Sequence, residues 1–195
     1  EFTRREKDVE SIQIKEKGLL LSDEQIKAAS KLVLLGRPEA GTDLVYLYLK
    51  YRGASSIPLK TWIYGSDTGL PTEKGTIVVA VQPKTPDEVA SIAQLQAKGA
   101  EIVIVSDQQV SNQAKEIARG GIISIQGQEK VFARIVVSEL VLLELLQRRG
   151  DLTMAQVSGE IKRLHSQIRG VEEVVSSFQA PQSHNSQALL RMIEH

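Results

Sequence analysis

The chain has 195 residues, enough for one ordinary domain with additional helices but too few for two full α/β domains. Hydrophobic residues make up 42% of it and aromatic residues only 4%, so we expect an aliphatic core of the kind found in parallel sheets covered by helices. Its 24 basic and 24 acidic residues cancel, which argues against binding to nucleic acid or to an anionic membrane. The absence of cysteine excludes disulfides and thiolate chemistry and favours a cytoplasmic protein.

No segment of the sequence predicts a membrane span or a signal peptide. The opening, EFTRREKDVE, is charged throughout. The most apolar run extends from Val131 to Leu146 and is interrupted by Arg134, Glu139 and Glu144. This run is also shorter than the ~20 residues that a bilayer requires, so we interpret it as a buried helix of a globular protein.

Strands and helices alternate along most of the chain. Short runs rich in Val, Ile and Leu predict five strands, at KLVLLG (31–36), IPLKTWIYG (57–65), TIVVAV (76–81), EIVIVS (101–106) and IISI (122–125). The second of these alternates apolar and polar residues, which predicts a more exposed strand. Helices are expected at SDEQIKAAS (22–30), GTDLVYLYLKYRG (41–53), TPDEVASIAQLQAKG (85–99), NQAKEIARG (112–120) and 131–149.

Two of these helices have a capping box at their start. Ser22 and Gln25 have the required spacing for the first helix. Thr85 is the expected N-cap of the third helix, with Pro86 at the first helical position and Glu88 completing the box. For the second helix, the sequence places Thr42 or Asp43 near the N-cap.

The helix at 131–149 is apolar on nearly every face, which predicts burial on all sides. One domain rarely surrounds a helix completely, so we expect a homodimer formed through residues 131–146. After Gly150, apolar residues recur at helical spacing and predict one long amphipathic helix or two shorter ones; they are Leu152, Met154, Val157, Ile161, Leu164, Ile168 and Val171. We expect three parts: an arm (1–21), an α/β domain (22–178) and a polar tail (179–195).

The order of elements, with Gly36 after the first strand and a capped helix after TIVVAV, resembles the sugar isomerase (SIS) family from about Ser22 to Phe178. The late helices resemble those in the isomerase half of glucosamine-6-phosphate synthase. This resemblance implies a three-layer αβα sandwich with a five-stranded parallel sheet in the order 2-1-3-4-5, a flavodoxin-like topology. In such a sheet, ligands bind where the first and third strands are neighbours.

The loops at that position depart from the family pattern. Members carry Gly-x-Gly-Thr-Ser after the first strand, whereas here RPEA separates Gly36 from Gly41. After the third strand they carry Ser-x-Ser-Gly and further hydroxyl residues that hold the sugar phosphate, and here only the hydroxyl of Thr85 survives. The positions that match the family's binding loops are Gly36, Arg37, Gly41, Thr42, Gln82, Lys84 and Thr85.

Phosphate binding at the second loop competes with a plain capping role. Lys84, Thr85 and the amides that follow supply donors for an anion at a helix N-terminus. However, Pro86 removes one amide, and Asp87 and Glu88 would occupy the positive end of the helix and repel an anion. In the first loop, Arg37 suits a bidentate grip on phosphate, but the nearby acidic residues favour a solvated loop.

A catalytic base is not evident. Sugar isomerisation requires a group that moves a proton between neighbouring carbons, usually His or Glu. The histidines lie on a polar helix face or in the tail: His165, His184 and His195. Of Glu129 and Glu139, the second is the better candidate because it interrupts an apolar helix, although an ion pair with Arg134 between subunits explains it equally well.

No other chemistry fits the sequence. It contains no P-loop, no metal-ligand spacing and no nucleophile elbow, so we expect neither metal nor cofactor. Trp62 and Tyr64 are interpreted as packing residues. The sequence favours a dimeric SIS-like module with a degenerate site, which senses a phosphosugar or acts through protein partners. The alternative is a divergent isomerase that binds phosphate through Thr42, Lys84 and Thr85 and uses a glutamate as base.

Overall fold

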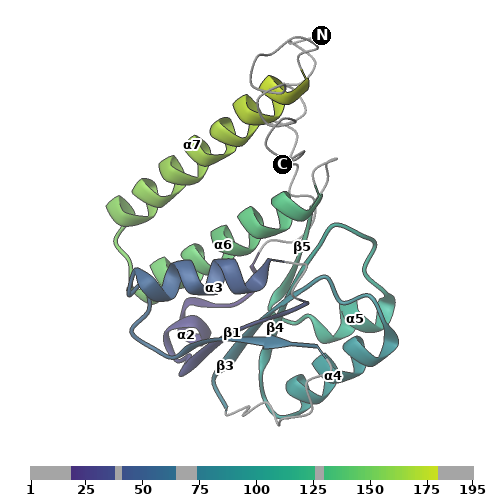
Figure 1. Ribbon diagram of the computed structural model, residues 1–195. Coiled ribbons are helices and arrows are strands. Elements are labelled where there is room, and N and C mark those ends of the chain that lie inside the picture. The colour runs from purple at the N-terminus through teal and green to yellow at the C-terminus, as the bar shows by residue number, and fades with distance from the viewer. Residues whose placement is uncertain (1–18, 38–40, 65–73, 126–129, 180–195) are drawn as a thin grey trace. The chain divides into compact units, whose positions relative to one another are not determined.

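A computed structural model describes residues 19–37, 41–64, 74–125 and 130–179. Its centre is a sheet of five parallel strands in the order β2-β1-β3-β4-β5 (Figure 1). The strands are β1 (Lys31–Gly36), β2 (Leu59–Ile63), β3 (Thr76–Val81), β4 (Glu101–Ser106) and β5 (Gly121–Ser124). This order and the parallel pairing confirm the predicted sheet.

Helices cover both faces of the sheet, which gives the predicted three layers (Figure 1). They are α2 (Asp23–Lys27), α3 (Thr42–Tyr51), α4 (Pro86–Ala97), α5 (Asn112–Ile117) and α6 (Lys130–Arg149). On one face, α4 and α5 enclose a core with side chains of the central strands, while α2, α3 and α6 form the layer on the other face. Because β1, β3 and β4 are covered on both sides, nearly all their residues are buried; β2, at the edge, is only half-buried.

Local sequence signals placed two of the helix starts correctly. Both capping boxes are present, with Ser22 and Thr85 as N-caps. The N-cap of α3 is Gly41, so Thr42 is the first residue of the helix and lies next to the N-cap, as the sequence placed it. Gly41 has φ +73°, a left-handed conformation that glycine adopts without strain, and the Thr42 side chain is buried beneath the turn.

The C-terminal end of α6 is tied to the segment around α2 by two arginines. Arg148 donates to the carbonyl of Leu21 at 2.8 Å, and Arg149 donates to the carbonyl of Ala29 at 2.6 Å. Besides α2, helix α6 packs on α3, β3 and β4, so the chain itself covers several faces of this apolar helix. A partner subunit is therefore not required to explain its burial.

The described chain divides into two compact units, the first ending at Thr153 and the second beginning at Met154. The second unit contains α7 (Met154–Gln179), a single continuous helix, which decides between the one-helix and two-helix alternatives. Leu152 precedes this helix and lies in the turn after α6, where its amide donates to the carbonyl of Leu146 at 3.3 Å. Within the described residues, no helix combines the length and apolar character needed to cross a bilayer.

Candidate functional site

The carboxyl ends of β1 and β3 lie side by side, since Leu35 pairs with Ala80. Arg37 follows β1 at this edge, and the loop 82–85 leads from β3 into α4. This is the position at which parallel α/β sheets bind ligands, because the connections from the two strands leave toward opposite faces of the sheet. The residues of these two segments therefore form the candidate site.

Three donors from the two segments converge on the carboxylate of Glu88, in the first turn of α4. The Nε of Arg37 lies 2.6 Å from Oε1 of Glu88. The other oxygen, Oε2, accepts the backbone N–H of Lys84 at 2.6 Å and that of Thr85 at 3.0 Å. The Thr85 hydroxyl in turn accepts the backbone N–H of Glu88 at 3.3 Å. The helix start thus holds an anion that belongs to the chain itself.

The electrostatic environment keeps Glu88 ionised. Its side chain is 9% exposed, and burial by itself raises the pKa of the carboxyl. The hydrogen bonds from Arg37, Thr85 and Lys84 together outweigh burial and hold the pKa of Glu88 below its ordinary value. A guanidinium and two backbone amides at a helix N-terminus are also the groups that bind a phosphate oxygen.

Tyr64 lies beside this arrangement at the end of β2. Its amide donates to the carbonyl of Gly36 at 3.3 Å, so the residue is adjacent to the start of the Arg37 segment. Its hydroxyl oxygen is buried and has no hydrogen-bond partner among the described residues. Burial raises the pKa of Tyr64, the Glu88 carboxylate raises it further, and Arg37 opposes both. Like Trp62, its ring packs against the core, as the sequence predicted.

Three of the expected ligand-binding residues occupy packing positions. A Cβ atom on Gly36 would lie 2.4 Å from Cγ2 of Thr42, and one on Gly41 would lie 2.4 Å from Cγ1 of Ile135 on α6. Thr42 is only 2% exposed. The glycines therefore allow α3 to approach β1 and α6 closely, which is a structural reason for their presence.

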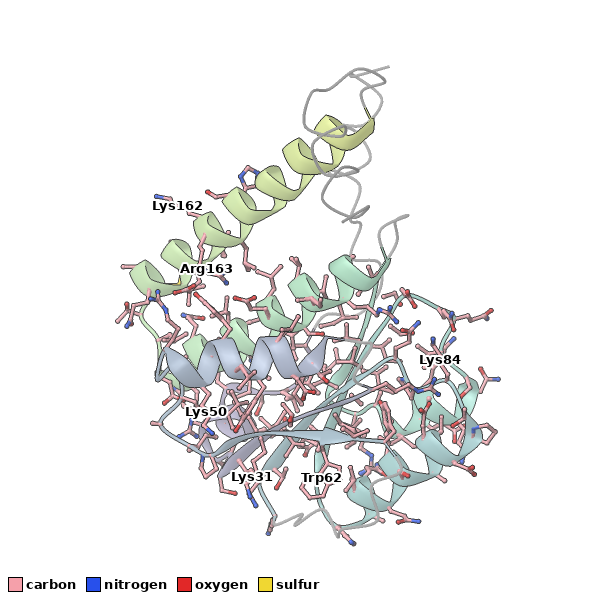
Figure 2. The ribbon with its side chains drawn as sticks, in the orientation of Figure 1. Lys31, Lys50, Trp62, Lys84, Lys162 and Arg163 are labelled. Atoms are coloured by element: carbon pink, nitrogen blue, oxygen red, sulfur yellow. The ribbon has the colours of Figure 1, made fainter. Side chains whose placement is uncertain are left out.

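Two other expected ligand-binding residues, Lys84 and Gln82, have side chains in different surroundings. The Lys84 side chain is exposed at the surface near α4, whereas its amide binds Glu88 (Figure 2). Gln82 is buried and has φ +51°, which is unusual for a residue other than glycine. Its Nε2 donates to Oδ1 of Asp107, which follows β4, and Nε of Arg134 on α6 lies 4.0 Å from Oδ2 of the same carboxylate.

Two of the catalytic candidates, Glu139 and His165, lie on described helices. Glu139 is buried on α6. Arg134, its expected partner, forms an ion pair with Asp107. His165 is exposed on α7, and Glu129, His184 and His195 lie outside the described residues. Nowhere in the described ranges do three His, Asp or Glu side chains come together as metal ligands would.

Comparison with known proteins identifies the architecture. No family model and no curated protein matches the sequence. The C-terminal domain of glucosamine-fructose-6-phosphate aminotransferase from Francisella tularensis aligns with a TM-score of 0.55 and 15% identity over 74% of this chain and 43% of its own. The sugar isomerase domain of an RpiR transcription factor from Sphaerobacter thermophilus aligns with a TM-score of 0.54 and 19% identity over 83% and 96% of the two chains. The chain has the fold of a sugar isomerase (SIS) domain.

A third structure with the SIS fold contains a ligand. It is the Vibrio vulnificus NanR protein complexed with ManNAc-6P, which aligns with a TM-score of 0.54 and 17% identity over 92% of this chain and 70% of its own. The chain spans about half the length of several of these structures: between 43% and 48% of the aminotransferase domain and of two proteins described as phosphosugar isomerases, and 57% of a third from Salmonella typhimurium. At these identities, the likeness establishes the fold alone.

The sequence predicted several of the residues that meet at this edge of the sheet. The prediction named Arg37, Lys84 and Thr85, which the structure brings together, and it noted that Glu88 would occupy the helix end. It missed Asp107, although an acidic residue directly after a buried strand at the carboxyl edge was an available signal. It also expected a solvated loop at Arg37, whereas this side chain is 29% exposed and ion-paired.

Proposed function

We propose that this chain is a regulatory SIS-fold module that binds the phosphate group of a sugar phosphate at the carboxyl edge of β1 and β3, without catalysing isomerisation. The observation that carries the proposal is the convergence of Arg37 and the amides of Lys84 and Thr85 on one anionic group. These are phosphate-binding groups at the position where the topology favours a ligand. Solved proteins with this fold include a transcription factor and a protein complexed with a sugar phosphate, which supports a sensing role.

Thermal melting tests this proposal. The purified chain is melted with fructose 6-phosphate, glucosamine 6-phosphate, sedoheptulose 7-phosphate and inorganic phosphate in turn. A ligand at ~100 times its dissociation constant adds about 2.7 kcal/mol and shifts the melt by several degrees. The shift should vanish in Arg37→Gln and persist in Lys98→Gln, which removes the same charge at the exposed C-cap of α4. If no sugar phosphate shifts the wild-type melt, the module acts through protein partners alone.

A divergent sugar-phosphate isomerase is the second candidate, and the buried carboxylate of Glu139 on α6 favours it. Turnover of a sugar phosphate that Glu139→Gln abolishes, with binding retained, would establish the enzyme and refute the purely regulatory role. A homodimer through residues 131–146 and a cytoplasmic location stay predictions. Light scattering at micromolar concentration tests the first, and a strictly monomeric mass would contradict it.

A further inference from the structure

The carboxylate of Glu88 uses all three donors that a phosphate group would need at this edge of the sheet. Oε1 accepts from Arg37, and Oε2 accepts from the amides of Lys84 and Thr85. Each of the two amides has a single N–H, which does not serve two anions at once, and a dianionic phosphate beside this carboxylate would be repelled. Ligand binding at this site therefore requires Glu88 to move.

We propose that Glu88 is an internal competitor that holds the anion site closed, and that a phosphate monoester binds when this side chain leaves Arg37 and the amides of Lys84 and Thr85. The inference rests on the proposed function and deepens it, because it gives the site two states. In the closed state the donors hold Glu88, and in the open state they hold the ligand.

The buried hydroxyl of Tyr64 points independently to a larger anion. A buried hydroxyl without a hydrogen bond is costly, and native structures contain few of them. As the Glu88 carboxylate lies here, its oxygens accept from Arg37 and from the amides of Lys84 and Thr85, and neither accepts from this hydroxyl. A phosphate monoester has additional terminal oxygens, so it offers an acceptor for the Tyr64 hydroxyl that the carboxylate does not.

Exchange between the two states requires little rearrangement of the backbone. The N-cap bond from the Glu88 amide to the Thr85 hydroxyl involves only the main chain of Glu88, so it persists when the side chain turns outward. Helix α4 thereby keeps one half of its capping box in the open state. The apparent dissociation constant equals the intrinsic constant divided by the population of the open state, so an open population of about 1–10% weakens binding about 10–100-fold.

Isothermal titration calorimetry of the full chain tests the competition, with fructose 6-phosphate and with inorganic phosphate as ligands. Glu88→Gln keeps the size of the side chain and removes its charge, and we expect it to bind either ligand at least about tenfold more tightly than the wild type. Asp87→Asn is the matched control, because it removes the same charge from the adjacent, exposed position of the helix. Its affinity should change less than about threefold, as expected for general charge at a helix end.

Each result of this titration decides a different point. Equal affinities of wild type and Glu88→Gln would refute the competition and leave the proposed function standing. Equal gains in Asp87→Asn and Glu88→Gln would refute it too, since general charge would then explain both. Tight binding by Glu88→Gln with none by the wild type would support the competition and refute sensing by the native chain. No binding by any variant would refute both.

Tyr64→Phe provides a second test that does not depend on the folding of the Glu88 variant. In the closed state the Tyr64 hydroxyl has no hydrogen-bond partner in the described part of the chain, so its removal should leave the melting temperature unchanged or raise it. The affinity of the same variant for fructose 6-phosphate should fall about three- to tenfold, the loss of one hydrogen bond. An unchanged affinity would refute the role of Tyr64 in the open state.

Discussion

Arg37, the first residue after β1, and Glu88, the third residue of α4, form an ion pair of 2.6 Å between Nε and Oε1. The pair joins segments 51 positions apart in the sequence. It connects the end of a central strand to the start of the helix that covers it, at the edge where ligands are expected. The same two side chains therefore affect both stability and binding.

A double-mutant cycle measures what this pair contributes to stability. Arg37→Gln and Glu88→Gln should each lower the free energy of unfolding, and the double variant should lose about 1 kcal/mol less than the sum of the two single changes. The physical reason is that each single change leaves the other charge partly buried without its main partner. Urea denaturation supplies the four values. Strict additivity would contradict a direct interaction.

The dependence of the free energy of unfolding on pH should reflect the ionisation of the Glu88 carboxyl. Its carboxyl has a lower pKa in the folded chain than the ordinary value of 4.5, so its contribution is complete above about pH 4.5 and is lost as the pH falls through the folded-state pKa. Wild type should therefore lose more stability than Glu88→Gln between about pH 7 and about pH 3. Urea midpoints across this range test the prediction. Parallel curves would show that the carboxyl is not held in its ionised form.

The close approach of α3 to β1 depends on the pair Gly36 and Thr42. Gly36→Ala places a methyl group 2.4 Å from Cγ2 of Thr42 in a buried position, and we expect a loss of about 1–3 kcal/mol in the free energy of unfolding. Thr42→Ser removes that carbon, so the double variant should recover most of the loss. Chemical denaturation of the three variants decides this. If Gly36→Ala lowers the free energy of unfolding as much in the Thr42→Ser variant as in the wild type, the added methyl group clashes with a group other than Cγ2 of Thr42.

The buried carboxylate of Asp107 should contribute more to stability than an exposed one. It faces Arg134, whose side chain is 7% exposed, and accepts from the amide of Gln82. Asp107→Ala removes both contacts and should cost about 2–3 kcal/mol, because polar groups of the buried cluster lose a partner. Glu144→Gln is the control. Glu144 is exposed on α6, the helix that also carries Arg134, and its Oε1 lies 3.7 Å from a guanidinium nitrogen of Arg148. That change should cost less than about 0.5 kcal/mol in the same urea assay, and equal costs would contradict the prediction.

The elements of the fold could be predicted because their signals are local. A capping box such as Thr85 with Glu88 operates over three positions, and a run such as TIVVAV encodes burial on both faces by composition alone. The strand order followed from the resemblance to SIS domains and is confirmed. At the start of α3 the sequence placed Thr42 or Asp43 near the N-cap, and the structure adds that Gly41 is the N-cap and that Thr42 is packed against Gly36.

The sequence by itself thus determined the strands, most helix starts and the edge at which a ligand is expected, and it supplied the residues Arg37, Lys84 and Thr85. Only the tertiary structure decided which group these donors hold. Composition cannot show that Arg37 reaches Glu88 rather than solvent, because that contact depends on how β1 and α4 are placed relative to each other. It also cannot show that Gln82 turns toward Asp107, or that the Tyr64 hydroxyl is buried and finds no partner within the residues that the structure describes. Such contacts between distant segments are set by the packed sheet and its helices, and they determine whether this SIS fold presents an open phosphate site or one filled by its own carboxylate.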